Sequence, residues 1–434
     1  MKKQFLIITI LLLGVLSVCS QNIVRQDSTA NKDNKTIFSR LQLGGYGEAI
    51  MSRFFYSDNY KRYSNATLYK DDNGYGQVDI PHVVFYISYD FGKGWKMSSE
   101  VEFEHGGTES AVEIEMEETG EYESEIERGG EVAIEQFWLE KSFSKAANLR
   151  MGHIIVPVGI TNSYHFPTEF FTTFRPESES SILPCTWHET GISFWGKTDG
   201  WHYEVQFIAG LDADRFGSQN WIKGGAGSPY EFKLATAYAG AFRIENYSLI
   251  KGLRLGISGY LGNSAANSLK KTNYADVKGT VAIGDFDFEY KSRNFIARGN
   301  IIYGHLSDSQ RITAINLASR NSSPSPKTPV ASDAMSIGVE WGFNIFRLLP
   351  CLRHSEHKLF FFKRYEYYDS MFKVAKGVLD NDCWERQQIT IGFNYFPIKD
   401  IVIKAQWSSR IFNDKYNNEN TISVGIAYSG MFIR

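Results

Sequence analysis

The sequence predicts an all-β protein, a sixteen-stranded antiparallel transmembrane β-barrel with long outer loops. Three observations lead to this prediction. Aromatic residues and glycine are abundant, with 31 Phe, 24 Tyr, 9 Trp and 38 Gly in 434 residues. Many short segments alternate apolar and polar residues with a period of two, which is typical of strands with two unlike faces. The connections between these segments alternate between short and long, which is typical of outer-membrane barrels.

Residues 1–20 have the pattern of a secretory signal peptide. Two lysines precede a long apolar run, and cleavage is expected after Ser20. Cys19 leaves a lipoprotein signal open as an alternative. Residues 21–38 are polar and aperiodic, so we expect a flexible periplasmic leader there. Residues 39–434 are then expected to form the barrel.

Sixteen segments have the composition of strands, and most have about the length that a tilted strand needs to cross a bilayer. An even number of strands, joined by seven turns and eight longer outer loops, places both termini on the periplasmic side. The segments lie at residues 39–54, 78–91, 94–104, 131–143, 147–157, 189–197, 201–210, 233–245, 253–261, 277–290, 293–304, 334–346, 358–370, 384–396, 400–410 and 420–433.

The clearest strands have one apolar face and one charged or polar face, as in residues 284–290 and 401–410. A lysine or arginine that faces lipid costs about 2–4 kcal/mol near the bilayer midplane, so we expect the charged faces to line a wet lumen. A soluble β-sandwich with one polar face is the alternative, but it does not explain the alternation of loop lengths. The candidates for the lumen wall are Asp285, Asp287, Glu289, Arg298, Arg364, Arg386, Lys404 and Arg410.

An unusually acidic stretch lies inside the outer loop 105–130, where eight of the fifteen residues from Glu113 to Glu127 are glutamate. Its carboxylates alternate with apolar residues, which predicts a hairpin that extends above the membrane. Such a hairpin would attract cations to the mouth of a pore and repel anions, and it could bind Ca²⁺. The alternative is a solvated hairpin whose charge only prevents edge pairing. The residues concerned are Glu113, Glu115, Glu117, Glu121, Glu123, Glu125 and Glu127.

Residues 150–191 contain "PVG", an asparagine, a histidine, "RP", a later proline and "WHETG" in this order. Together with "KRYEYYD" (363–369) and "IGFNYFPIKDIVIKAQW" (391–407), they resemble the phosphate-selective porin O and P family. The resemblance covers nearly all of the chain after residue 20. It implies a trimeric sixteen-stranded porin in which one long loop folds into the lumen as a constriction.

The loop at 158–188 would be this constriction. Its candidates for narrowing or filtering the pore are Asn162, His165, Arg175, Glu177, Glu179, Trp187 and His188. The alternative is that the proline, tryptophan and histidine residues only pack the loop against the wall. The resemblance does not imply phosphate selectivity, because anion pores need rings of Arg or Lys and no repeated arginine series is present. Basic wall residues opposite an acidic loop would instead give a transverse field.

The function that we expect is that of an outer-membrane porin in a Gram-negative bacterium. It would form a water-filled pore for diffusion of ions or small polar solutes, in contact with membrane lipid and assembled as a homotrimer. The alternative is a largely closed barrel whose acidic loops bind a partner or divalent cations such as calcium. No other cofactor is expected.

Two further classes of function are disfavoured by the sequence. The net charge of −3 is not that of a nucleic-acid-binding protein. Neither G-x-S-x-G nor H-E-x-x-H occurs, and "RHSEH" (353–357) falls in a periplasmic turn, so we do not expect an enzyme.

Overall fold

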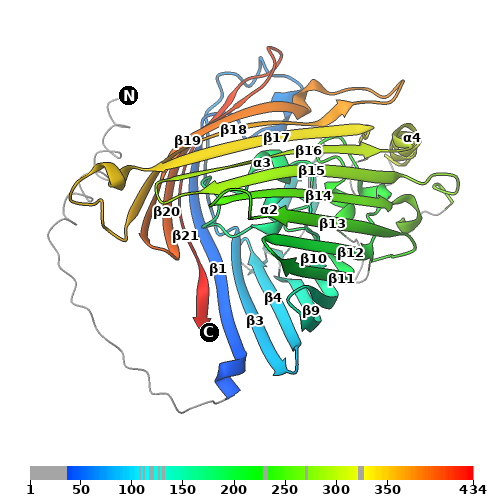
Figure 1. Ribbon diagram of the computed structural model, residues 1–434. Coiled ribbons are helices and arrows are strands. Elements are labelled where there is room, and N and C mark those ends of the chain that lie inside the picture. Colours follow the sequence, from blue (N-terminus) through cyan, green and yellow to red (C-terminus); the bar gives the residue numbers. More distant parts are fainter. Residues whose placement is uncertain are drawn as a thin grey trace.

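Sixteen antiparallel strands close into a barrel in the computed structural model (Figure 1). The structure describes residues 37–106, 109–110, 113–116, 122–125, 128–129, 132–227, 233–268, 272–320 and 327–433. The predicted signal peptide and nearly all of the predicted leader lie outside the described residues. Among the described residues, no helix is long and apolar enough to cross a membrane.

Each barrel strand pairs with the next one along the ring, and β21 pairs with β1 to close it, from Leu43 opposite Ile433 to Phe54 opposite Thr421. Every one of the sixteen predicted segments coincides with a barrel strand to within a few residues, so the predicted fold class is confirmed. The strands are β1 (Leu41–Phe54), β3 (His82–Gly92), β4 (Trp95–Glu104), β9 (Val132–Ser144), β10 (Ala147–Ile155), β11 (His188–Thr198), β12 (Trp201–Ala209), β13 (Tyr238–Asn246), β14 (Leu253–Asn263), β15 (Thr280–Lys291), β16 (Phe295–Leu306), β17 (Asp333–Asn344), β18 (Lys358–Lys373), β19 (Glu385–Ile398), β20 (Ile401–Ile411) and β21 (Glu419–Ile433).

Several short strands lie outside the ring. β2 (Gly76–Asp79) pairs with the outer end of β1. In the acidic stretch, β5 (Glu109–Ser110) pairs with β8 (Arg128–Gly129), and β6 (Glu113–Met116) pairs with β7 (Tyr122–Glu125). This backbone register places Glu113 opposite Glu125 and Glu115 opposite Glu123, whereas Glu117, Glu121 and Glu127 lie outside the described residues.

Short helices lie in the connections between strands and before β1. They are η2 (Ile37–Arg40), η3 (Tyr60–Tyr63), α2 (Ile160–Ser163), α3 (Glu177–Ser180), η4 (Ala213–Arg215), η5 (Lys223–Ala226), η6 (Ala265–Asn267), α4 (Ser309–Ser319), η7 (Ile345–Leu348) and η8 (Asp382–Trp384). Figure 1 shows α2 and α3 inside the barrel, so the connection between β10 and β11 folds into the lumen.

The two faces of the barrel wall differ as the alternation predicted. On the outer face, apolar side chains such as Val205, Ile257 and Phe286 are 58, 54 and 46% exposed. On the inner face, charged side chains such as Asp287 and Glu340 are fully buried. The apolar outer face can contact lipid. The charged side chains of the inner face require partners, because a buried unpaired charge is strongly destabilising.

The longer loops also build an apolar core at one end of the barrel. Buried residues of the connections that follow β10, β12, β14, β16 and β18 pack together, with Trp187 and Trp221 fully buried among them. Trp187 contacts Tyr260 of β14, with ring centroids 4.9 Å apart. This core fixes both ends of the connection that enters the lumen.

Candidate functional site

The connection between β10 and β11, here called the inner loop (residues 156–187), crosses the lumen and bonds to walls on several sides. A backbone N–H of this loop donates to the wall at each of three places along its path. The pairs are Gly159 N to Ser258 Oγ of β14 (3.1 Å), Thr173 N to Gln406 Oε1 of β20 (2.8 Å) and Ser178 N to Glu366 Oε1 of β18 (2.8 Å). The hydroxyls of Thr168 and Ser429 on β21 also form a hydrogen bond. The inner loop is therefore held across the barrel.

Glu179 ties two turns of the inner loop to each other and to the wall. Its fully buried carboxylate accepts hydrogen bonds from the backbone N–H groups of Thr161 (2.8 Å) and Asn162 (3.4 Å), which begin α2. The other oxygen accepts from Asn300 Nδ2 on β16 (2.8 Å). Gly159 precedes α2 with φ +87°, and a Cβ there would overlap the Glu179 carboxylate, so this close approach requires glycine.

Asn162 joins the two ends of the inner loop. Its Nδ2 donates to Val158 O, and its Oδ1 accepts from Trp187 N, both at 2.8 Å. Asn162 is 1% exposed, so its amide is used for this internal contact and does not face a solute path.

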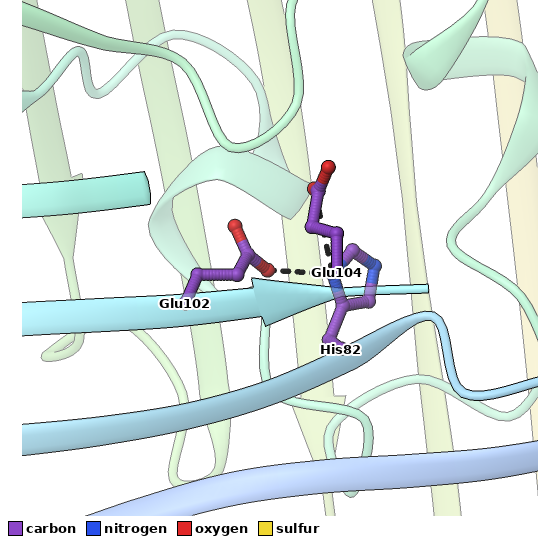
Figure 2. Close-up of side chains that lie close together, drawn as sticks. All are labelled: His82, Glu102 and Glu104. Atoms are coloured by element: carbon purple, nitrogen blue, oxygen red, sulfur yellow. Dashed lines mark hydrogen bonds and ion pairs between the residues drawn. The ribbon is translucent and has the colours of Figure 1, made fainter. Parts of the chain in front are cut away.

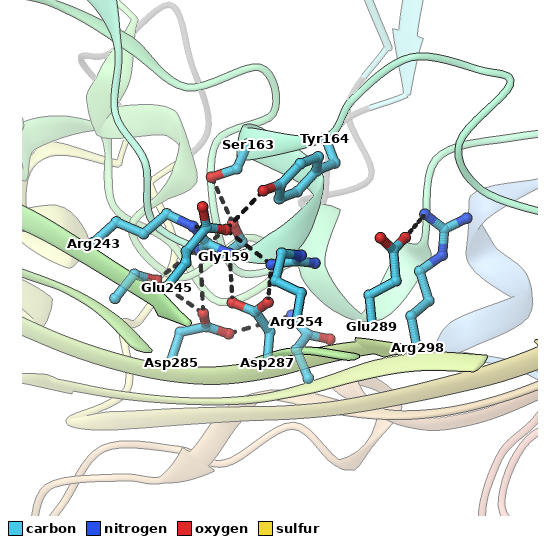
Figure 3. A network of polar contacts seen from close by, with 12 residues as sticks. Gly159, Ser163, Tyr164, Arg243, Glu245, Arg254, Asp285, Asp287, Glu289 and Arg298 are labelled. Carbon is cyan, nitrogen blue, oxygen red and sulfur yellow. Dashed lines mark hydrogen bonds and ion pairs between the residues drawn. The ribbon is translucent and has the colours of Figure 1, made fainter. Parts of the chain in front are cut away.

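A network of ion pairs anchors the start of the inner loop to β13, β14 and β15 (Figure 3). Arg243 bonds Asp287 (2.7 Å) and Glu245 (2.9 Å), and Arg254 bonds the same two carboxylates (2.6 and 3.0 Å). Tyr164 of the inner loop donates its hydroxyl to Glu245 (2.8 Å), and the Arg254 guanidinium lies 4.2 Å from the Tyr164 ring centroid. Two arginines thus share two carboxylates, which satisfies buried charge on both sides.

The predicted basic strip on the wall (Arg298, Arg364, Arg386, Lys404 and Arg410) exists, but its members are already engaged. Arg298 and Arg364 both pair with Glu340, and Arg364 also contacts Glu366 at 3.1 Å. Lys404 donates to two carbonyl groups of the inner loop, at Phe170 (3.0 Å) and Thr172 (2.6 Å).

The two remaining members of the strip are also engaged, Arg410 by carboxylates and Arg386 by a carbonyl group of the connection after β18. Arg410 pairs with Glu419 and with Glu177 of the inner loop. Arg386 donates to Cys383 O at 2.9 Å and lies 4.8 Å from the Trp384 ring centroid. The basic strip therefore holds the inner loop and neutralises wall carboxylates, and it is not a ring of cations open to an anion.

Another part of the lumen wall, on β1, β4 and β9, is acidic. We call Glu48 of β1, Glu100, Glu102 and Glu104 of β4 and Glu135 of β9 the acidic wall. Four of the five are at most 7% exposed, and Glu104 is half-buried. The alternation of Glu100, Glu102 and Glu104 with Val101 and Phe103 is visible in the sequence, whereas Glu48 and Glu135 join them only through strand pairing.

Few inner-loop groups face the acidic wall. Thr186 Oγ1 donates to Glu135, and His165 Nε2 lies 3.8 Å from Glu100 Oε1. The Arg175 guanidinium interacts electrostatically with Glu102 and Glu135, and these attractions help to raise the pKa of this loop arginine against the effect of burial. The acidic wall therefore has five carboxyl groups, and the inner loop brings one arginine and one histidine near them.

The structure divides the seven predicted constriction residues into two groups. Asn162, Glu179 and Trp187 are buried and hold the inner loop together, which corresponds to the packing alternative. His165, Arg175 and Glu177 reach charged wall residues, and His188 contacts His153 with ring centroids 4.6 Å apart. Seven of the eight predicted lumen-wall residues are buried on the inner face, and the eighth, Arg410, is partly exposed, with 21% of its side chain accessible.

The inner loop fits closely against β16 and β18. The cavity between them has a volume of about 10 Å³ and is lined by Tyr164, Phe170, Pro176, Arg298 and Arg364, among others. A cavity of this size holds about one water molecule. A solute path therefore does not run along this side of the inner loop.

Comparisons with known proteins agree with the fold. No family model matches the chain, so the resemblance to the phosphate-selective porin O and P family stays a prediction. An uncharacterized protein of Aquifex aeolicus is 26% identical over 384 residues, which is 87% of this chain and 78% of that protein.

Two solved structures share the barrel. Salmonella typhi OmpF, in a complex with daunomycin, has a TM-score of 0.54 at 10% identity and covers 91% of this chain and 98% of its own. The outer membrane channel DcaP of Acinetobacter baumannii has a TM-score of 0.51 at 11% identity and covers 90% of this chain and 97% of its own. At 10–11% sequence identity, these two comparisons show a shared fold and nothing about function.

Proposed function

We propose that this chain is an outer-membrane porin with a narrow lumen, through which ions or small polar solutes diffuse. The observation that carries the proposal is the inner loop, which is bonded to walls on several sides inside a closed barrel. An apolar outer face and a charged inner face support the same function. The resemblance in the sequence favours a homotrimer in the outer membrane of a Gram-negative bacterium, with both termini in the periplasm.

The charges of the lumen favour cations over anions. The basic strip is engaged largely by wall carboxylates and inner-loop carbonyl groups, whereas the acidic wall has five carboxyl groups, which only one arginine and one histidine of the inner loop approach. Carboxylates in a low-dielectric passage attract cations and repel anions. We therefore expect a cation preference and no phosphate selectivity.

A largely closed barrel that binds a partner or divalent cations is the second candidate, and the packing of the interior favours it. Arg243, Asp287, Glu340 and Glu366 are at most 1% exposed, and the outer loops build an apolar core. In this case the inner loop would seal the lumen and the outer surface would carry the function.

Single-channel recording separates the two candidates. The purified, folded protein is added to a planar bilayer, and its reversal potential is measured in a salt gradient. Conductance steps in groups of three with cation preference are expected for a trimeric narrow porin. Anion preference would contradict the argument from charge, and an absence of steps from correctly folded protein would favour the closed barrel.

A further inference from the structure

A histidine and two glutamates converge at the outer end of β3 and β4 (Figure 2). His82 lies directly opposite Glu104 in the strand register, and Glu102 lies two residues earlier on the same face. His82 Nδ1 is 2.5 Å from Glu102 Oε1 and 3.8 Å from Glu104 Oε1. One potential ligand atom from each residue lies within 4.8 Å of the other two.

We propose that His82, Glu102 and Glu104 bind a divalent transition-metal ion of the zinc class at the outer mouth of the barrel. An imidazole nitrogen with carboxylate oxygens suits zinc and related ions, whereas calcium and magnesium prefer oxygen ligands alone. Zinc ligands lie about 2.0–2.2 Å from the ion and therefore about 3.5 Å from one another.

The distances around His82 fit this geometry with a small adjustment. Glu104 already lies at the required spacing from His82 Nδ1. The Glu102 carboxylate has to exchange its hydrogen bond with the imidazole for a bond to the metal. The proton shared by Nδ1 and Glu102 then leaves to solvent, as metal binding to such ligands requires.

Glu48 supplies an independent observation that points to an ion. This carboxylate is 7% exposed, its Oε1 lies 3.9 Å from His82 Nε2, and within the described chain its Oε2 has no hydrogen-bond partner. A metal-bound histidine almost always donates its other N–H group to a carboxylate or a carbonyl. Metal at Nδ1 would place the proton on Nε2, where it faces the buried Glu48 carboxylate.

Further carboxyl groups and two cationic side chains surround the triad. The acidic wall brings the carboxyl groups of Glu100 and Glu135 close to Glu102, so the triad lies among further oxygen ligands. Arg175 and Lys404 compensate part of the charge of the acidic wall. The side chains of His82, Glu102 and Glu104 are 14, 5 and 32% exposed, so Glu104 opens the triad towards the outer side.

The site would bind its ion whether or not the barrel conducts, so the proposal stands apart from the proposed function. The full chain, folded in detergent, is stripped with EDTA, dialysed, and titrated with ZnCl₂ in an isothermal calorimeter in the presence of excess CaCl₂. One zinc ion per chain is expected. Replacement of the ligand in His82→Gln should weaken binding at least 100-fold, and Glu48→Gln should weaken it about 10-fold.

His305→Gln is the matched control. His305 also contacts a carboxylate, with its Nδ1 3.0 Å from Asp333 Oδ1, but it is exposed and, among the residues that the structure describes, does not belong to a cluster of three ligands. Its zinc affinity should equal that of the unchanged protein. Native-gel mobility before and after heating confirms that each variant is folded.

Three results would overturn the proposal. They are zinc binding by His82→Gln with unchanged affinity, no zinc binding by the unchanged protein even without calcium, and zinc binding that is lost when the excess calcium is present. The first would place the ion elsewhere, for example on the acidic hairpin. If His82→Gln does not fold, Glu104→Gln replaces it, because this half-buried ligand can be changed with less effect on packing, and at least 10-fold weaker binding is expected.

Discussion

Removing the Glu179 carboxylate should release the inner loop. Glu179→Ala deletes the acceptor of two strong hydrogen bonds, from Thr161 N and Asn300 Nδ2 at 2.8 Å, and of a longer one from Asn162 N at 3.4 Å. A hydrogen bond to a charged group contributes about 1.5–3 kcal/mol. The two strong bonds together therefore contribute about 3–6 kcal/mol to the docked state of the loop.

This loss should be visible in single-channel records. Since 1.4 kcal/mol is a factor of ten, we expect the population of undocked inner loop to rise by a factor of about 10²–10⁴. The variant should show larger or rapidly fluctuating conductance steps. Glu179→Gln keeps an acceptor for Thr161 N but offers Asn300 an amide, so its effect should be intermediate.

Glu169→Ala is the matched control for this experiment. Glu169 lies on the same inner loop, is half-buried, and among the described residues its side chain makes no hydrogen bond. Its conductance should equal that of the unchanged protein. If folded Glu179→Ala also conducts unchanged, the inner loop does not limit the pore and the reasoning is wrong.

Three further changes test the packing and the electrostatics. Gly342→Ala places a Cβ against the Phe171 ring, so overpacking should lower stability by about 1–3 kcal/mol, measured as a lower Tm in detergent. Arg243→Met leaves Asp287 with Arg254 alone and should lower the free energy of unfolding by about 3–5 kcal/mol. The loss is measured as less heat-resistant folded protein on a gel. An unchanged melting curve would contradict the role of the ion pairs. Burial raises the pKa of Asp212, in the loop after β12, from 3.8 to about 6. The folded loop therefore binds the carboxyl proton more tightly than the unfolded chain does. The stability of this loop should fall as pH rises from about 4 to about 6. Asp212→Asn, which keeps the acceptor for Asp214 N, should remove this pH dependence in hydrogen exchange.

The barrel strands could be predicted because their signal is local. A strand such as β15 places Asp285 and Asp287 on one face and Phe286 on the other, and the same alternation recurs across the chain. Short turns and long loops then give the strand order, because antiparallel neighbours follow one another in sequence.

The functions of individual inner-loop residues could not be predicted, because their partners are distant in sequence. Glu179 bonds Asn300, which is 121 residues away, and the partner of Lys404 on the inner loop is 234 residues away at Phe170. The sequence identified the basic strip as a set of residues, but the pairing of Arg298 and Arg364 with Glu340 depends on register between strands. The position of His82 beside Glu102 also depends on the register between strands, here β3 and β4, and so could not be predicted either.

The seam between β1 and β21 has a consequence for the order of assembly. Its pairs, such as Tyr46 with Ser429, join residues almost a full chain length apart, and contacts with such separation form late in folding. The inner loop bonds to Ser429 on β21 and to strands on the far side of the barrel. We therefore expect the strands to gather around the inner loop before the ring closes, so that this loop acts as a scaffold during folding and a constriction afterwards.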